Sequence, residues 1–330
     1  MKDHANDDIE LTARLSDSIK NVKSEISKVI IGQNEIIDNL LLSILSRGHC
    51  LLIGVPGLAK TLIIKTLSEV LDLKFNRIQF TPDLMPSDIT GTEIIDEDQT
   101  TRKRAFRFIE GPIFSNIILA DEINRTPPKT QSALLEAMQE HKVTAAGMTY
   151  ALPEPFFVLA TQNPIEQEGT YPLPEAQLDR FMFNLWLDYP AYDEELEIVR
   201  STTSSYQAEL KKIISAREII EFQDLVRRVP VADNIIEYSV KLVNKTRPGS
   251  NGNDKYIKDW ISWGAGPRAS QYLILAAKAR AVMQGRFTPS LDDVKASVIP
   301  VLRHRLIVNF SAEAEGVTSV DIINRILTSL

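Results

Sequence analysis

The sequence predicts an α/β protein in which a three-layer αβα domain with a parallel sheet precedes an all-α domain. Short apolar segments have the composition of buried strands, and helical segments separate several of them, the order that gives a parallel sheet covered on both faces. These segments are 50–53, 75–80, 117–120, 156–160 and 181–187. Beyond Asp188-Tyr189-Pro190 only helical patterns follow, so we expect one domain over 1–189 and a second over 190–330.

The first domain also carries an N-terminal helical region and two inserts. Apolar residues recur three and four positions apart from Leu11 to Val29, which predicts an amphipathic helix, and a second helix follows through Leu45. Residues 91–108 and 142–152 each have the pattern of a β-hairpin placed between the strands of the sheet. The sequence alone leaves the role of both hairpins open.

Composition restricts the class of protein. The 330 residues carry a formal net charge of −7, which argues against non-specific nucleic-acid binding, because that binding depends on basic contacts to phosphates. The single cysteine, Cys50, cannot form an intramolecular disulfide and fits a reducing cytoplasm. No apolar stretch approaches the roughly 20 residues of a membrane span. We therefore expect a cytoplasmic protein with no membrane span.

The strongest motif is Gly54-Val55-Pro56-Gly57-Leu58-Ala59-Lys60-Thr61, which follows a predicted strand and opens a helix at Leu62. This is the setting of a phosphate-binding loop, whose backbone N–H groups and helix N-terminus favour anionic phosphates. Lys60 would reach the β- and γ-phosphates of ATP, and Thr61 would ligate Mg²⁺. Ala59 stands where the pattern has its last glycine, so an ordinary strand-to-helix turn is the alternative.

A second motif, Ile117-Ile118-Leu119-Ala120-Asp121-Glu122, is an apolar strand that ends in two acids. A Walker B strand places its aspartate beside the metal, so Asp121 would hold Mg²⁺, with Glu122 as the general base that polarises the attacking water. A strand ending in two solvated acids is the alternative, and it is rare downstream of a phosphate loop.

A third strand ends in a polar cluster at Thr161-Gln162-Asn163. In this order the cluster has the position of sensor 1, where Asn163 would orient the water or contact the γ-phosphate. Pro164 follows directly and favours a turn, so Asn163 as a simple turn residue is the alternative.

Two arginines complete the predicted site. Arg180, in Leu178-Asp179-Arg180-Phe181, has the position of an arginine finger that stabilises transition-state charge in a neighbouring subunit. A surface ion pair with Asp179 or Glu175 is the alternative. Arg268 opens a helix of the second domain and has the position of sensor 2. A solvated arginine is the alternative, although a cation at a helix N-terminus is slightly unfavourable.

Together these segments resemble the MoxR family of AAA+ ATPases. The resemblance covers about residues 25–310, and alanine at position 59 is normal for that family. Its most specific stretches are 54–61, 81–91, 119–125, 160–174 and 175–181.

The resemblance implies an αβα nucleotide-binding domain, a helical lid, and hexamers that bind ATP and Mg²⁺ between subunits. It also implies that Ile31-Gly32-Gln33 borders the adenine and that the two hairpins face the pore of the ring. The segment near 244–266 corresponds to an extra element that swings the lid, which leaves open whether Arg268 acts within its own subunit or on a neighbour.

Chaperone-like remodelling or maturation of an unknown client protein, beside a partner with a von Willebrand factor A domain, is what the family implies for function. A nucleic-acid motor is an alternative, because helicase-related AAA+ proteins share the two inserts, and a magnesium-chelatase-like motor subunit is another, because its ATPase core is similar. The acidic net charge argues against the first of these. A nucleotide-gated scaffold with little turnover is a further alternative, which Glu122, Asn163 and Arg180 argue against, since a pure binder does not need them.

Overall fold

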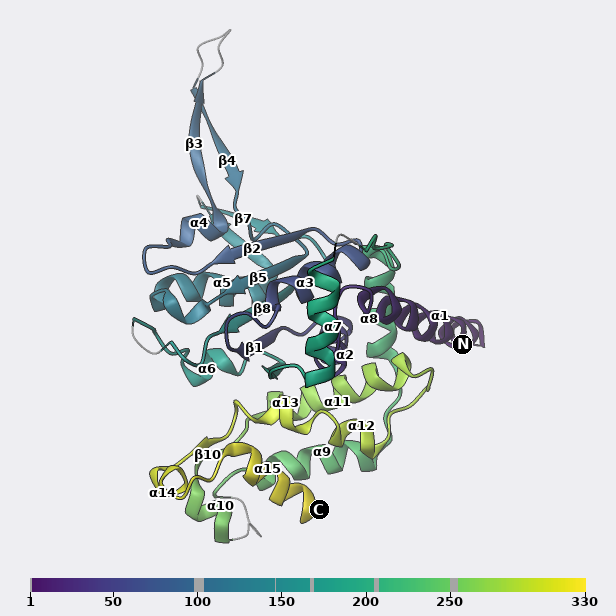
Figure 1. Cartoon of the computed structure of the whole chain (residues 1–330). Helices are drawn as coiled ribbons and strands as arrows, with labels where there is room; N and C mark the ends of the chain where they lie inside the picture. Colours follow the sequence, from purple (N-terminus) through teal and green to yellow (C-terminus); the bar gives the residue numbers. More distant parts are fainter. Residues whose placement is uncertain (1, 98–103, 146, 167–168, 205–207, 250–254) are drawn as a thin grey trace.

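A five-stranded parallel sheet forms the centre of the first domain in this computed structural model, which describes the chain except residues 1, 98–103, 146, 167–168, 205–207 and 250–254. The strands lie in the order β2-β5-β8-β1-β9 (Figure 1), and every neighbouring pair is parallel. Their bounds are β1 Cys50–Gly54, β2 Phe75–Gln79, β5 Ile117–Asp121, β8 Phe157–Gln162 and β9 Phe183–Leu187. The prediction of five strands and a parallel sheet is confirmed.

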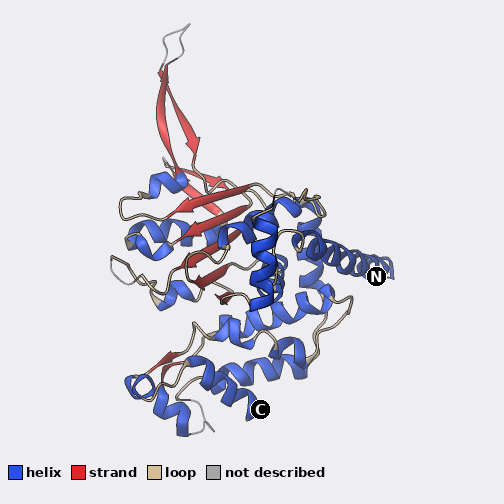
Figure 2. Ribbon diagram, viewed as in Figure 1, coloured by secondary structure: helices blue, strands red, loops and turns tan. Residues whose placement is uncertain are grey.

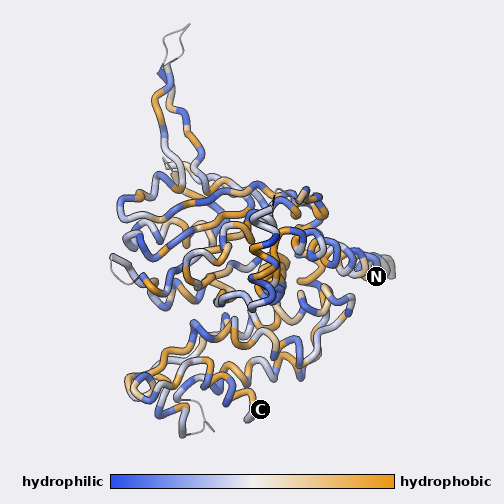
Figure 3. Tube along the Cα trace, viewed as in Figure 1, coloured by the Kyte–Doolittle hydropathy of each residue, from blue (hydrophilic) through white to orange (hydrophobic). Residues whose placement is uncertain are grey.

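Alternating side chains of these strands enter two separate apolar layers, as the period of two in a strand requires. In β1, Cys50 and Leu52 pack with one layer and Leu51 with the other. The first layer is covered by α2 (Asn34–Leu45) and α3 (Lys60–Val70), and α1 (Lys2–Ile26) packs against α3. The second is covered mainly by α5 (Pro128–Glu140). Helices cover both faces of the sheet (Figure 2), and the central strands are among the most hydrophobic parts of the chain (Figure 3). The three-layer αβα prediction is therefore confirmed.

Both predicted hairpins are present. The first comprises β3 (Gly91–Glu97) and β4 (Arg104–Glu110), and the second β6 (Lys142–Ala145) and β7 (Met148–Ala151). The β3–β4 hairpin follows the short helix α4 (Pro86–Thr90) and stands away from the rest of the domain (Figure 1). Residues 98–103 and 146, near the two turns, lie outside the described residues.

The elements after β9 are mostly helices, and we call them the lid. Its helices are α7 Tyr192–Thr202, α8 Ala216–Arg228, α9 Asp233–Lys245, α10 Lys255–Trp260, α11 Pro267–Met283, α12 Leu291–Lys295, α13 Val298–Leu302, α14 Phe310–Ala314 and α15 Ser319–Thr328. Helix α8 packs against α1 and α2 of the first domain. The division at residue 189 stays a prediction. No helix in the described part of the chain is both long and apolar enough to cross a membrane.

The expectation that only helices follow residue 190 is wrong in one place. The lid contains a small antiparallel sheet of β10 (Ile261–Trp263) and β11 (Ile307–Val308), in which Ile261 faces Val308. Strands of two and three residues are too short to show a period of two, and the partner lies more than forty residues further along the chain. Neither feature is visible in a local sequence pattern.

His49, at the start of β1, connects three elements of the core. Its Nδ1 accepts a hydrogen bond from the Val158 backbone N–H (3.1 Å), and its Nε2 lies 3.0 Å from the Met138 carbonyl oxygen. The neutral ring with its proton on Nε2 satisfies both contacts, whereas a second proton on Nδ1 would face an N–H group. Burial lowers the pKa of His49 to about 4.

This geometry predicts a loss of stability in mild acid. Unfolding raises the pKa of His49 to its ordinary value of about 6.5, so the unfolded chain binds the proton first and the folded state loses stability as pH falls from 6.5 towards 4. Between pH 7 and pH 5 we expect His49 to contribute about 2 kcal/mol of that loss. Urea titrations at both pH values, on wild type and His49→Gln, measure it. An equal pH dependence in both proteins would contradict the prediction.

Candidate active site

The phosphate-loop motif forms a tight connection between β1 and α3. Gly57 (φ 88°) and Ala59 (φ 56°) both have left-handed backbone conformations. A side chain added at Gly57 would meet no heavy atom within 4 Å, so the loop borders open space. Ala59 accepts a conformation that favours glycine, which costs roughly 1 kcal/mol. The predicted nucleotide-binding residues of the loop and the first turn of α3 are Val55, Pro56, Gly57, Leu58, Ala59, Lys60, Thr61 and Leu62.

Lys60 begins α3 and turns back across the loop. Its Nζ donates a hydrogen bond to the Gly54 carbonyl oxygen at 2.6 Å. Partial burial lowers the pKa of Lys60, while the nearby carboxylates of Asp121, Glu122 and Glu166 oppose that effect. The amine therefore lies in the electrostatic field of Asp121 and Glu122 at the carboxyl end of β5.

Asp121 ends β5 and has its carboxylate held from two sides. The Thr161 hydroxyl donates to Oδ1 at 2.6 Å. Arg77 on β2 donates to Oδ2 from Nη2 at 2.6 Å and from Nε at 3.0 Å. Because Asp121 is only 8% exposed, these bonds fix both oxygens at the carboxyl-terminal edge of the sheet.

Glu122, the next residue, has a left-handed backbone (φ 58°, ψ 49°) that is rare for a residue with a side chain. Its N–H donates to the Thr161 hydroxyl at 2.9 Å, so one threonine contacts both acids. Its Oε2 accepts hydrogen bonds from Gln79 (2.9 Å) and from Arg125 (3.0 Å). Such strained positions gather at functional sites, where the surrounding structure enforces them.

Asn163 follows β8 and is 5% exposed. Its Oδ1 accepts a hydrogen bond from the Ile165 backbone N–H at 3.1 Å, which is an Asx turn. The turn interpretation therefore describes this side chain in the present conformation. Its role as sensor 1 stays a prediction, and its position beside the carboxyl end of β8 is compatible with that role.

Arg180 lies at the opposite edge of the sheet from these residues. It follows α6 (Glu175–Leu178) and precedes β9, whose Phe183 pairs with Cys50 at the start of β1. Its Nη1 donates to the Leu135 carbonyl oxygen of α5 at 2.6 Å. The structure shows no ion pair from Arg180 to Asp179 or Glu175, although all three residues are described.

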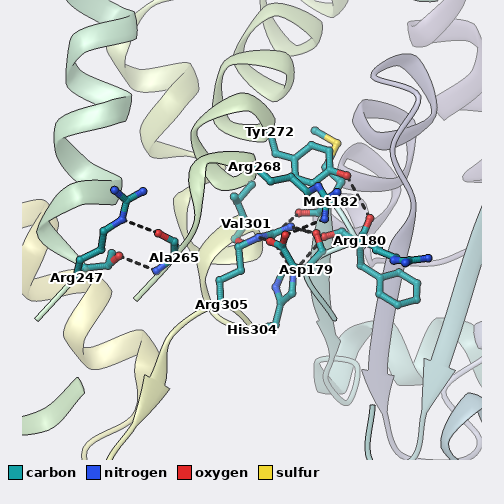
Figure 4. Close-up of polar contacts among 12 residues, drawn as sticks. Asp179, Arg180, Met182, Arg247, Ala265, Arg268, Tyr272, Val301, His304 and Arg305 are labelled. Carbon is teal, nitrogen blue, oxygen red and sulfur yellow. Dashed lines mark hydrogen bonds and ion pairs between the residues drawn. The ribbon is translucent and has the colours of Figure 1, made fainter. Parts of the chain in front are cut away.

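Asp179 pairs with arginines of the lid instead. Arg268 Nη1 lies 2.9 Å from Asp179 Oδ2, and Arg305 Nε lies 2.7 Å from Oδ1 (Figure 4). Arg268 therefore contacts the segment that carries Arg180 and not the phosphate loop of its own chain. Arg268 is thus ion-paired while its side chain stays 40% exposed, and both the sensor 2 role and its alternative stay predictions.

The predicted adenine segment, Ile31-Gly32-Gln33, connects α1 and α2. Gly32 and Gln33 both have left-handed backbones. The carboxylate of Glu194 on α7 packs so closely that a side chain at Gly32 would lie 2.5 Å from it. Gln33 Nε2 donates to the Asp188 carbonyl oxygen at 3.3 Å. The segment thus joins the first domain to the start of the lid, and its adenine contact stays a prediction.

Comparisons with known proteins agree with this geometry. Residues 49–183 match the family described as "ATPase family associated with various cellular activities (AAA)", and residues 254–326 match the AAA lid domain. The Mycobacterium tuberculosis protein named Chaperone MoxR1 is 43% identical over 93% of this chain and 80% of its own length. The Bacillus subtilis protein YeaC, which is uncharacterised, is 42% identical over 92% of both chains. The chain belongs to the MoxR family of AAA+ ATPases.

A solved structure supports the same assignment. A crystal structure of a Cytophaga hutchinsonii protein, presented there only as a candidate ATPase, superposes with a TM-score of 0.90 at 45% identity, over 97% of this chain and 96% of that one. The present chain is accordingly an ATPase with an AAA+ domain and a helical lid.

The residues at the site fit ATP and Mg²⁺. The loop borders open space at Gly57, Lys60 is the cation at its end, and Asp121 offers a carboxylate at the adjoining strand end. Mg²⁺ prefers oxygen ligands and keeps several waters, which suits a site built from Thr61, Asp121 and phosphate oxygens. Both carboxylate oxygens of Asp121 accept hydrogen bonds here, Oδ1 from Thr161 and Oδ2 from Arg77, so a metal ligated by Asp121 would share an oxygen with one of these donors.

Four residues that contact Asp121 or Glu122 were not predicted as site residues. Two lie outside the sequence motifs, and two lie inside them but had no role assigned. Arg77 and Gln79 lie two apart on β2 and therefore point to the same face, and Gln79 is directly opposite Asp121 in the register. Arg125 and Thr161 stand inside recognised stretches and contact the two acids. Arg77 and Gln79, two polar positions on either side of Ile78, were a usable signal, but the pairing of β2 with β5 was needed to interpret it.

Lys60→Ala is expected to weaken ATP binding at least about tenfold, or about 1.4 kcal/mol. The reason is that the variant removes the amine that bonds to the loop at Gly54 and lies in the field of Asp121 and Glu122. Titration calorimetry with a slowly hydrolysed ATP analogue measures the affinity. Lys65→Ala is the matched control, because Lys65 is an exposed lysine on the same helix and pairs with Glu69. Equal affinities for the two variants would contradict the assignment.

Proposed function

We propose that this chain hydrolyses ATP with Mg²⁺ in a ring, hexameric as in its family, and uses the hydrolysis to remodel or mature a partner protein. One observation supports the ring above the others. The loop, Asp121 and Glu122 lie past the carboxyl ends of the strands, whereas Arg180 lies before the amino end of β9. Four residue steps along β9 separate these edges by roughly 13 Å, more than an arginine side chain spans. Arg180 can therefore act as an arginine finger only on the site of a second copy of the chain.

Each residue then has a separate task. Lys60 and the N-terminus of α3 hold the phosphates, and Thr61 with Asp121 would hold the Mg²⁺, which supplies positive charge to the transferred phosphoryl group. Glu122 accepts a proton from water once its carboxylate is free of Gln79 and Arg125. Asn163 orients that water, and Arg180 of the adjacent subunit stabilises the developing charge.

The partner is proposed to be a protein. The β3–β4 hairpin exposes apolar side chains that face each other across its strands, Ile95 (62% exposed) and Phe106 (73% exposed). Exposed apolar groups of this size indicate an interaction surface, and a net charge of −7 disfavours binding to the phosphate backbone of a nucleic acid. A relative is named a chaperone. The partner with a von Willebrand factor A domain is taken from the family resemblance alone, and the client is proposed only as a protein.

The proposal is tested by ATP hydrolysis measured against protein concentration, with and without Mg²⁺. Specific activity should rise with concentration in parallel with ring formation measured by light scattering, and chelation of Mg²⁺ should abolish it. A specific activity that stays constant while the protein is monomeric would refute the shared site. Hydrolysis that persists in excess chelator would refute the metal assignment.

A further inference from the structure

The turn that carries Arg180 is held by the lid along its whole backbone. Arg305 Nη2 donates to the carbonyl oxygens of Asp179 (2.8 Å) and Phe181 (2.7 Å), and its Nη1 lies 3.3 Å from that of Met182. The Tyr272 hydroxyl donates to the Arg180 carbonyl oxygen at 3.2 Å. All four consecutive carbonyls, from 179 to 182, therefore accept a hydrogen bond from a lid side chain (Figure 4).

Arg305 is the centre of this arrangement. Its side chain is 2% exposed, and Asp179 supplies the compensating charge. The guanidinium also lies over the ring of Tyr272, 5.2 Å from its centroid. Removing one partner of a buried pair leaves an uncompensated charge that is costly. The lid and the turn are thus held in one relative position by a buried group, and Arg268 adds a second, more exposed contact to the same carboxylate.

The side chain of Arg180 is held separately, by α5. Its Nη1 bonds to the Leu135 carbonyl oxygen, beside a cavity of about 310 Å³ lined by residues of α5 and α6. The backbone of Arg180 is therefore held by the lid and its guanidinium by the first domain. A shift of the lid would move the backbone and change where the guanidinium points.

We propose that Arg305, together with Tyr272, is a positioning residue for Arg180, so that the lid of one subunit sets the rate of hydrolysis in its neighbour. This inference rests on the proposed function, in which Arg180 completes the adjacent site. In this arrangement the lid acts on the neighbouring site through the four backbone carbonyls of the turn that carries Arg180. It does not act through the phosphate loop of its own subunit.

Two variants test the route, each with a matched control. Tyr272→Phe removes only the hydroxyl that reaches Arg180, and Tyr238→Phe removes a lid hydroxyl that has no hydrogen-bond partner in the described structure. Arg305→Lys keeps the positive charge but removes the planar guanidinium and its several N–H donors. Arg286→Lys makes the same change in an Arg–Asp ion pair that lies entirely within the lid. We expect kcat to fall about threefold for Tyr272→Phe and about tenfold or more for Arg305→Lys, with KM for ATP within about twofold.

Mixed assemblies separate positioning from simple loss of structure. Arg305→Lys has an intact base but a misplaced finger, so adding Glu122→Gln, which has the reverse, should restore activity above that of either protein alone. Restoration, with both controls near wild type, is the expected result. If Arg180→Ala is restored by Glu122→Gln and Arg305→Lys is not, this inference fails while the shared site stands. If neither is restored, the proposed function itself fails.

Discussion

Glu122→Gln is expected to bind ATP with near wild-type affinity and to hydrolyse it at least about 100-fold more slowly, the usual contribution of a general base. The amide cannot accept the proton from water, yet it keeps the shape of the carboxylate. Its oxygen can still accept from Gln79 or Arg125, and the backbone bond from Glu122 N–H to Thr161 is unchanged. The loss should therefore be confined to turnover.

Single-turnover hydrolysis and binding of a fluorescent ATP derivative measure the two quantities separately. Glu166→Gln is the matched control, because Glu166 lies 3.7 Å from the same Arg125 but is more exposed and has no place in the proposed mechanism. The control should hydrolyse ATP within a fewfold of wild type. If Glu122→Gln turned over at the control's rate, a different group would have to be the base.

The sequence was sufficient for the sheet and for the residues that follow its strands. Runs such as 117–120 are apolar on both faces of the sheet, so they identify buried strands without any knowledge of pairing. Motifs that follow β1 and β5 are local in the chain, and a parallel sheet brings their carboxyl ends to one edge. The positions of Lys60, Asp121 and Glu122 follow from these two facts.

The contacts between the first domain and the lid could not be predicted in this way. Arg305 lies 126 positions from Asp179 in the chain, and nothing in its surroundings, Leu302-Arg303-His304-Arg305, marks it as a buried cation. Burial of an arginine depends on a carboxylate that another element supplies. For the same reason the sequence paired Arg180 with a neighbouring acid as an alternative, whereas the structure gives that acid to Arg268 and Arg305.

Arg180→Ala is expected to bind ATP normally and to lose hydrolysis by about a thousandfold, the lower range for an arginine finger. Affinity should be kept because Arg180 lies at the amino-terminal edge of the sheet, beside Leu135 and away from its own phosphate loop. Arg217→Ala, which removes an exposed lid arginine that pairs with Glu221 on the same helix, controls for the loss of a cation. Hydrolysis and binding are measured as for Glu122→Gln. Wild-type turnover in Arg180→Ala would rule out the finger.

The decisive measurement is a mixture of Arg180→Ala with Glu122→Gln. Each protein alone is inactive, but in a ring whose interfaces run head to tail, about a quarter of the interfaces in a random equal mixture join an intact base to an intact finger. Activity near a quarter of the wild-type value therefore requires that Arg180 acts on the adjacent subunit. If Arg180 instead served its own site, both residues of every pair would lie in one chain, and no mixing ratio would restore hydrolysis.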